Sequence, residues 1–339
     1  MNRHVLRYMF VLLLLIASPG QAHDPLREDG GHDHHSQHLE HAAENPDLAE
    51  VRSLVTRFRE TGNDTHLDKA WSILESAVRQ ASNDPETLVA AAFVAQSRHE
   101  FELAMQLLEQ AQSIRRNYDE SWLLKASIHL VRGESNEAAQ ACAQLRSVPP
   151  LVVLTCNARV SLVNGHSARA LAWLGGVLRA VDASETPPDM YAWALSVAGD
   201  LAVATGDAQQ ARTYYQQSLE LAERTQVRAA LVDVLLGEGN DQAAWQALDA
   251  GTTALPLLVR RFIVAKRLDR LPALAPELDR TEREFEAWIA AEDWLHAREM
   301  ARFYVDVVSR PDLARRLALI NFGLQREPED LLLEQRTRG

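Results

Sequence analysis

The fold class of this 339-residue chain is decided by the stretch GDAQQARTYYQQSLE, residues 206–220. A Gly-Asp turn leads into a segment in which Ala211, Tyr215 and Ser218 recur at three- and four-residue spacing. Positions spaced in this way lie on one face of a helix. The small residues would let a neighbouring helix approach closely, and the tyrosine would fill the gap above them. The stretch therefore predicts the second helix of a helix-turn-helix unit.

The same pattern recurs along the chain, with an alanine after each predicted turn at successive spacings of 34, 34, 32, 41 and 33 residues. A glycine stands five residues before four of these alanines, where it can end a helix in the left-handed conformation. A second position, which is leucine in four of the six units, follows each alanine after four residues. The register alanines are Ala70, Ala104, Ala138, Ala170, Ala211 and Ala244, and the positions four residues later are Leu74, Leu108, Cys142, Leu174, Tyr215 and Leu248.

A period near 34 with this pattern resembles the tetratricopeptide repeat. The first helix of that repeat is matched best by WLLKASIH at residues 122–129, and RTYY at 212–215 matches the second helix. The resemblance covers residues 64–250 and implies an all-α fold. The expected architecture is an α-solenoid of stacked helix-turn-helix repeats, which wind into a right-handed superhelix with a concave groove. We expect these repeats over residues 46–250.

Residues 251–339 lose the repeat pattern, and we expect them to form degenerate or capping helical repeats, because an end repeat meets water on one face. The segments WLHARE at 294–299 and QREP at 325–328 resemble the tail of exported tetratricopeptide proteins of proteobacteria. Those proteins are largely uncharacterised, so the resemblance implies a compartment and no mechanism.

The N-terminus reads as a signal peptide over residues 1–22. Arg3 and Arg7 precede ten apolar residues, and small residues lead to an expected cleavage after Ala22. The mature protein is therefore expected to be periplasmic or secreted. No later stretch approaches 18 consecutive apolar residues, so we expect no membrane insertion of the mature chain.

Residues 23–45 form a polar, histidine-rich segment that we expect to be disordered. Imidazole is a good ligand for zinc, nickel or copper, so the segment could bind one of these ions weakly. A solvated histidine tail without a metal is the alternative. The candidate ligands are His23, His32, His34, His35, His38 and His41.

The two cysteines, Cys142 and Cys156, lie on the second helix of one predicted repeat and the first helix of the next. Such helices pack against each other in a solenoid. In an oxidising compartment the pair could form a disulfide, and two independent buried thiols are the alternative.

The composition excludes several classes of function. A formal net charge of −12 argues against a nucleic acid or an anionic membrane surface as partner, because both would repel the chain. The sequence contains no Gly-x-Ser-x-Gly, no phosphate-binding glycine loop and no His-Glu-x-x-His. We therefore expect no enzymatic activity and no required cofactor.

The first helices of the repeats should line the concave groove, where aromatic and arginine side chains often dominate binding. The groove candidates are Phe93, Leu123, Ser127, Arg159, Trp193 and Asp200. Apolar members of this set could instead belong to the core. The sequence favours an exported scaffold or adaptor that binds another envelope protein or a peptide. The alternative is a metal-handling accessory protein that uses the histidine-rich segment.

Overall fold

The protein is described by a computed structural model that covers residues 46–61, 63–79, 83–248 and 252–338. In these ranges every regular element is a helix and there is no strand, which confirms the expected all-α class. The expected signal peptide (1–22) and histidine-rich segment (23–45), with its six candidate ligands, lie outside the described residues.

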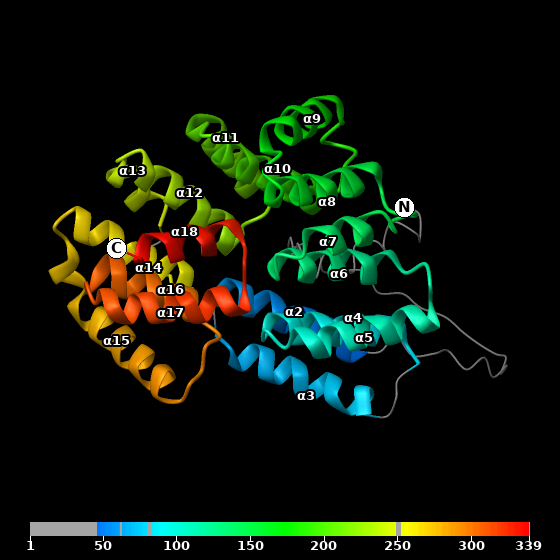
Figure 1. Cartoon of the computed structure of the whole chain (residues 1–339), viewed down its shortest axis with the longest axis horizontal. Coiled ribbons are helices and arrows are strands. Elements are labelled where there is room, and N and C mark those ends of the chain that lie inside the picture. Colours follow the sequence, from blue (N-terminus) through cyan, green and yellow to red (C-terminus); the bar gives the residue numbers. More distant parts are fainter. Residues whose placement is uncertain (1–45, 62, 80–82, 249–251, 339) are drawn as a thin grey trace, which may run out of the picture.

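Most of the chain consists of helix pairs that stack one on the next (Figure 1). In each pair a first helix packs against the second helix that follows it. The pairs are α2 (Pro46–Thr61) with α3 (Thr65–Arg79), α4 (Pro85–Ser97) with α5 (Phe101–Ile114), α6 (Asp119–Val131) with α7 (Ser135–Cys142), α8 (Pro150–Val163) with α9 (Ser167–Ala180), α10 (Pro188–Ala204) with α11 (Ala208–Leu221), and α12 (Thr225–Gly237) with α13 (Asp241–Gln246).

The predicted register is confirmed by burial. Every register alanine lies on a second helix and is buried, and so is every residue four positions later. In the pair α10–α11, the buried residues of α11 are Ala211, Tyr215 and Ser218. The small side chains of Ala211 and Ser218 allow the close approach that the sequence indicated, and the Tyr215 ring packs against Gly199. A Cβ atom added at Gly199 of α10 would lie only 2.4 Å from the ring of Tyr215.

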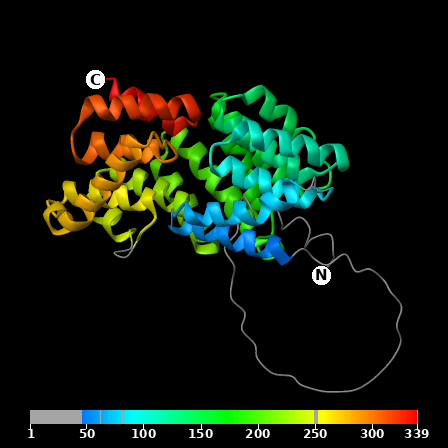
Figure 2. The ribbon, with the colours of Figure 1, turned by 90° about the horizontal axis from the view of Figure 1, so that it is seen from below.

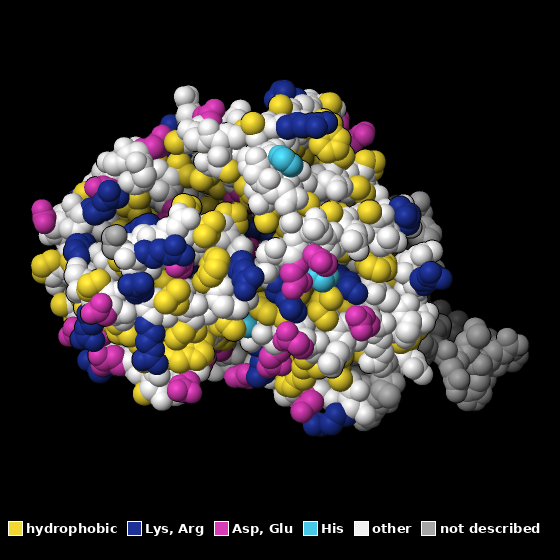
Figure 3. Space-filling view, in the orientation of Figure 1, with side chains coloured by type: hydrophobic (Ala, Val, Ile, Leu, Met, Phe, Trp, Pro, Cys, Tyr) yellow, Lys and Arg dark blue, Asp and Glu magenta, His cyan; other side chains and the backbone are white. Residues whose placement is uncertain are grey.

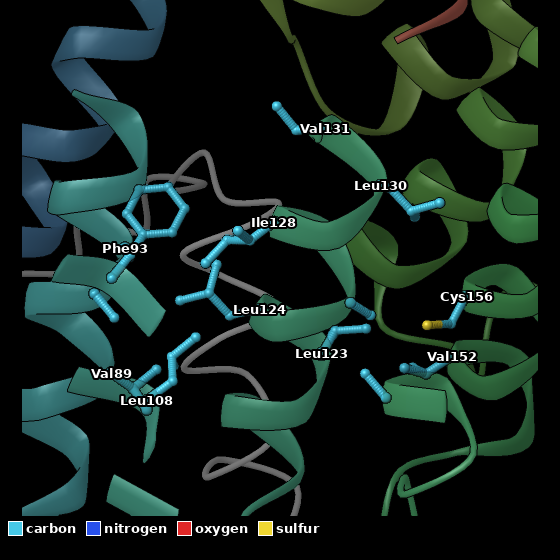
Figure 4. Packing of buried hydrophobic residues seen from close by; sticks show 14 of the residues in the cluster. Val89, Phe93, Leu108, Leu123, Leu124, Ile128, Leu130, Val131, Val152 and Cys156 are labelled. Atoms are coloured by element: carbon cyan, nitrogen blue, oxygen red, sulfur yellow. The ribbon is translucent and has the colours of Figure 1, made fainter. Parts of the chain in front are cut away.

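The stacked pairs share a continuous apolar core in two clusters. One cluster runs from α2 to α10, and the second continues from the end of α10 to α18. In the close view, Val89 and Phe93 of α4 face Leu124 and Ile128 of α6 (Figure 4). A single pair could not bury such a face, so the stability of each repeat depends on its neighbours.

The C-terminal region differs from the helix pairs that precede it. Its core is aromatic, because Phe262, Phe285, Phe303 and Tyr304 are fully buried and contact one another. The elements are α14 (Leu255–Arg267), the 3-10 turn η1 (Leu271–Leu274), α15 (Ala275–Ala290), α16 (Ala297–Arg302), the π-helical η2 (Phe303–Val307), α17 (Pro311–Leu324) and α18 (Pro328–Thr337).

These last helices curl back toward the beginning of the solenoid (Figures 1 and 2). The side chain of His296, just before α16, lies 3.1 Å from Asp64, just before α3. The chain therefore brings together residues that are 232 positions apart in the sequence. Among the described helices, none combines the length and hydropathy needed to cross a bilayer.

Cys142 and Cys156 form a disulfide that joins the end of α7 to α8. Their Cα atoms are 5.9 Å apart, and both residues are buried. The bond joins two consecutive repeats, so it fixes the packing of one pair on the next.

Replacing both cysteines by alanine is expected to lower the free energy of unfolding by about 3 kcal/mol, because the bond closes a loop of about 15 residues in the unfolded chain. Urea unfolding of the oxidised wild type, the reduced wild type and the double variant measures this difference. Reductant should destabilise the wild type and leave the variant unchanged. An equal effect of reductant on both proteins would contradict the assignment.

Candidate functional site

The candidate site is a cavity of about 160 Å³ on the inner side of the solenoid. Three consecutive first helices build it. Its lining residues are Leu123, Ala126, Ser127 and Leu130 of α6, Cys156 and Arg159 of α8, and Trp193 of α10. Apolar groups dominate the wall, and the guanidinium of Arg159 and the hydroxyl of Ser127 add polar groups. A space of this size suits one apolar side chain and is small for a drug-sized ligand or a cofactor.

The structure places the six predicted groove residues in three different environments. It brings Leu123, Ser127, Arg159 and Trp193 together around the cavity. Phe93 differs from the expectation, because it is buried in the core between α4 and α6 (Figure 4). Its ring packs between adjacent repeats, so it does not line the groove. Asp200 lies further along α10, outside the cavity lining.

Asp200 is held by a contact within its own repeat. The hydroxyl of Tyr215 donates a hydrogen bond to the Asp200 carboxylate at 2.8 Å. Burial raises the pKa of Asp200 to about 7, although the Tyr215 hydrogen bond and the charge of Arg159 act in the opposite direction. Asp200 is therefore a proton-binding group within the solenoid and has a structural partner.

Replacing Asp200 by Asn is expected to change the pH dependence of stability. Between pH 4 and pH 7 the folded protein holds a proton that the unfolded chain, with a pKa of about 3.9, has released. The favourable contribution is thus present below pH 4 and is lost as the pH rises through 7. The variant should match the wild type near pH 4 and be about 1 to 3 kcal/mol more stable at pH 8. Urea unfolding at both pH values measures this, and a constant difference would contradict it.

A segment from the C-terminal region crosses the inner side next to the cavity. We call residues 325–330 the strap; they connect α17 to α18 and form its first turn. The backbone N–H of Arg326 donates to the carbonyl of Val131, the last residue of α6, at 2.7 Å. The Glu327 carboxylate lies 3.7 Å from Arg159. The strap thus reaches two of the first helices that build the cavity.

His99 anchors the strap from the turn after α4. It stands five residues before Ala104, at the position that glycine occupies in other repeats, and its φ of 60° is in the left-handed region. The side-chain amide of Gln325 donates to Nε2 of His99 at 3.0 Å. Burial and the nearby charge of Arg298 lower the pKa of His99 to about 4, so its ring is neutral and can accept this bond.

Arg298 of α16 holds the strap from the other side. It donates to Glu327 at 2.9 Å, to Gln325 at 3.2 Å and to both oxygens of Asp330 at 2.6 and 2.8 Å, and it also pairs with Glu329. The Asp330 side chain is fully buried. Burial by itself raises the pKa of Glu327, but Arg298 and Arg159 outweigh this effect and lower it.

A second charged cluster lies between α12, α14 and α16. Asp233 accepts two hydrogen bonds from Arg260, at 2.6 and 3.0 Å, and two from Arg302, at 2.7 and 2.9 Å. Burial opposes ionisation of Asp233, but the two guanidinium groups outweigh it and lower its pKa to about 2. Paired geometry of this kind fixes the relative position of the helices.

The sequence pointed to part of this arrangement. The segments at 294–299 and 325–328 stood out together, and the structure shows that they contact each other through Arg298, Gln325 and Glu327. The role of His99 could have been noticed from the missing glycine five residues before Ala104. The Asp233 cluster has no local signal, because its three members belong to different helices.

Nothing in the described ranges resembles a metal centre, since no group of three His, Cys, Asp or Glu side chains there is placed to hold an ion. The histidine-rich segment lies outside these ranges, so its candidate metal ligands stay a prediction. The cavity offers a partner an apolar wall, one cationic group and an adjacent carboxylate.

No protein-family model and no curated protein sequence matches this chain. Solved structures do match it. A Rap protein complexed with competence and sporulation factor is 14% identical, with a TM-score of 0.53, over 88% of this chain and 89% of that one. A tetratricopeptide repeat protein from Parabacteroides merdae is 12% identical, with a TM-score of 0.41, over 86% and 100%. NprR in complex with its cognate peptide NprX is 14% identical, with a TM-score of 0.46, over 84% and 89%.

The likeness to the Rap protein extends over most of both chains and shows the fold alone. The stacked pairs, the buried register alanines and this likeness agree with the repeat that the sequence resembles. The chain is an all-α solenoid of tetratricopeptide-type helix pairs whose C-terminal strap crosses its inner side.

Proposed function

We propose that the protein is an exported scaffold that binds a segment of another envelope protein on the inner side of its solenoid. The observation that carries this proposal is the cavity shared by α6, α8 and α10. A site built from three consecutive repeats can bind an extended or helical segment along its length, because neighbouring repeats present equivalent positions side by side.

The cavity has the composition of an interface centre. It offers an apolar space for one side chain, with Trp193 and Arg159 on its border, and these two residue types are enriched among those that dominate binding energy. The face of the molecule in Figure 3 shows acidic and basic side chains interspersed with apolar ones, which is typical of a solvated face. The inner cavity is therefore the better candidate for recognition.

Two features support an envelope location. Residues 1–22 have the pattern expected of a signal peptide, and the disulfide joins two buried cysteines. Disulfides persist in oxidising compartments such as the periplasm. The Rap protein of similar fold is complexed with competence and sporulation factor, and we propose that this chain likewise binds a partner, on the inner side of its own solenoid.

Capture of partners from envelope extracts tests the proposal. The full mature chain should retain a partner. The double variant Arg159→Ala/Trp193→Ala should capture at least tenfold less of that partner. The matched control is Arg169→Ala/Trp173→Ala on α9, where Trp173 is 53% exposed on a second helix. The proposal fails if both double variants retain the partner equally or if the control loses it as well.

A second candidate function rests on the histidine-rich segment, in which six of the twelve histidines lie between residues 23 and 41. In this alternative the segment binds zinc, nickel or copper, and the repeats deliver the ion to another protein. Calorimetry with each ion, on the mature chain with and without residues 23–45, tests it. Binding that is lost with the segment supports the alternative, and no binding in either protein contradicts it.

A further inference from the structure

The strap provides a template for the partner, because its own contacts show what the inner side accepts. We propose that the strap is an internal ligand, and that the partner's segment is an extended chain whose acidic side chain replaces Glu327 at Arg159. This inference rests on the proposed function, since it names the chemistry of the segment that the cavity takes up.

The first part of the site, the carbonyl of Val131, binds the backbone of the ligand. Val131 ends α6, and the last carbonyls of a helix have no partner within the helix. Its carbonyl accepts from the N–H of Arg326 at 2.7 Å. Gly133 makes this approach possible, because a Cβ atom there would lie 3.2 Å from Cβ of Arg326 and its φ of 75° suits glycine. Any extended chain could supply the same N–H, so this contact requires a backbone rather than a particular side chain.

The second part of the site, the guanidinium of Arg159, binds a carboxylate of the ligand. Arg159 lines the cavity and also lies 3.7 Å from the Glu327 carboxylate. One guanidinium therefore borders both an apolar space and an anion position. The matching ligand is an extended segment that carries a carboxylate close to an apolar side chain, so that both positions are filled at once.

The contacts of the strap divide into a fixed set and an exchangeable one. Arg298 keeps Asp330, which is fully buried, and Glu329 as partners even when Glu327 moves away. By contrast, the pair of Arg159 and Glu327 is long, and its side chains are 26% and 27% exposed. Pairs of this kind contribute little, so an incoming carboxylate can replace Glu327. Glu327 also accepts from Arg298 at 2.9 Å and caps the first turn of α18. Its carboxylate therefore needs to leave only Arg159 for the anion position beside the cavity to open.

The test uses a fluorescent, end-capped peptide with the sequence of residues 322–329, FGLQREPE, as probe for the full mature chain at 0.15 M salt. The Glu327→Gln protein should bind the probe about tenfold more tightly than the wild type, a difference of about 1.4 kcal/mol, because its own strap competes less. The Glu329→Gln protein is the matched control, since it loses one carboxylate on Arg298 and leaves Arg159 paired. It should stay within twofold of the wild type.

Two further measurements complete the test. The tenfold gain in probe affinity should disappear when Arg159→Ala is added to Glu327→Gln. It should also disappear when the glutamate that corresponds to position 327 in the probe is replaced by glutamine. Hydrogen exchange at the amide of Arg326 should be about tenfold faster in Glu327→Gln. The amide of Ala222, which caps the end of α11 by donating to the carbonyl of Ser218, is the unchanged reference. This second readout does not depend on the probe. Equal probe affinity of wild type and Glu327→Gln, or a gain that survives without Arg159, would overturn the inference.

The outcomes separate this inference from the proposed function. If Arg159→Ala/Trp193→Ala abolishes partner capture while Glu327→Gln changes neither probe affinity nor capture, the inner side is the binding site and the strap is only structural. If no partner is captured by the wild type, the proposed function fails first.

Discussion

Replacing Arg298 by alanine is expected to lower the free energy of unfolding by about 3 to 5 kcal/mol, the cost of removing one partner from a buried ion-pair network. Arg298 is the donor that joins α16 to the strap, through Gln325, Glu327, Glu329 and Asp330. Without it, the fully buried Asp330 keeps only uncharged donors, such as the side-chain amide of Asn321 at 2.6 Å and the backbone N–H of Glu327 at 2.9 Å. Urea unfolding of wild type and variant measures the loss.

Arg310→Ala is the control for this first prediction. Arg310 also pairs with two carboxylates, those of Glu282 and Glu286, but its side chain is 49% exposed. Exposed pairs contribute about 0 to 1 kcal/mol, so its loss should be small. If the two variants were equally stable, the Arg298 network would not stabilise the closed arrangement of the C-terminal helices.

Replacing Asp233 by alanine is expected to cost a similar amount, about 3 to 5 kcal/mol, because it leaves Arg260 buried without its bidentate partner. The side chain of Arg260 is only 2% exposed, and its remaining carboxylate, Glu299, is 3.5 Å away. The variant should therefore loosen the packing of α12 on α14. Unfolding monitored by circular dichroism measures the change.

The pH dependence of this effect distinguishes the ion pairs from simple packing. The pKa of Asp233 in the folded protein is lowered to about 2, below the value of about 3.9 in an unfolded chain. Its contribution is thus present above pH 4 and is lost as the pH falls toward 2. The stability difference between wild type and Asp233→Ala should shrink over that window. The variant Asp233→Ala/Arg260→Met should recover part of the loss, because it no longer buries the Arg260 charge. A difference that is independent of pH would contradict the assignment.

The repeat architecture could be predicted from the sequence because its signals are local. Ala211, Tyr215 and Ser218 share one face of α11 as a result of helical geometry alone, and they are the buried residues of that helix. The cavity was partly predictable for the same reason. Leu123, Arg159 and Trp193 occupy related positions on successive first helices, and stacking brings such positions side by side.

The position of Phe93 could not be predicted from the repeat register. Residues of a first helix face either the neighbouring repeat or the groove, and a shift of one position changes which of the two a side chain meets. The ring of Phe93 packs toward α6 and is buried (Figure 4). Amino-acid type could not decide this, since phenylalanine suits a core and an interface equally well.

What the sequence by itself determined is the helix pairs, their register and the two cysteines that could meet between repeats, because each depends on spacing within one helix or between adjacent pairs. Only the tertiary structure decided that the C-terminal helices return to the first repeats. His296 meets Asp64 across 232 positions, and Gln325 meets His99 across 226. Such contacts depend on the accumulated curvature of the whole solenoid, which small rotations between successive pairs set together. No local pattern records that sum, so the strap and the site beside it emerged only from the fold.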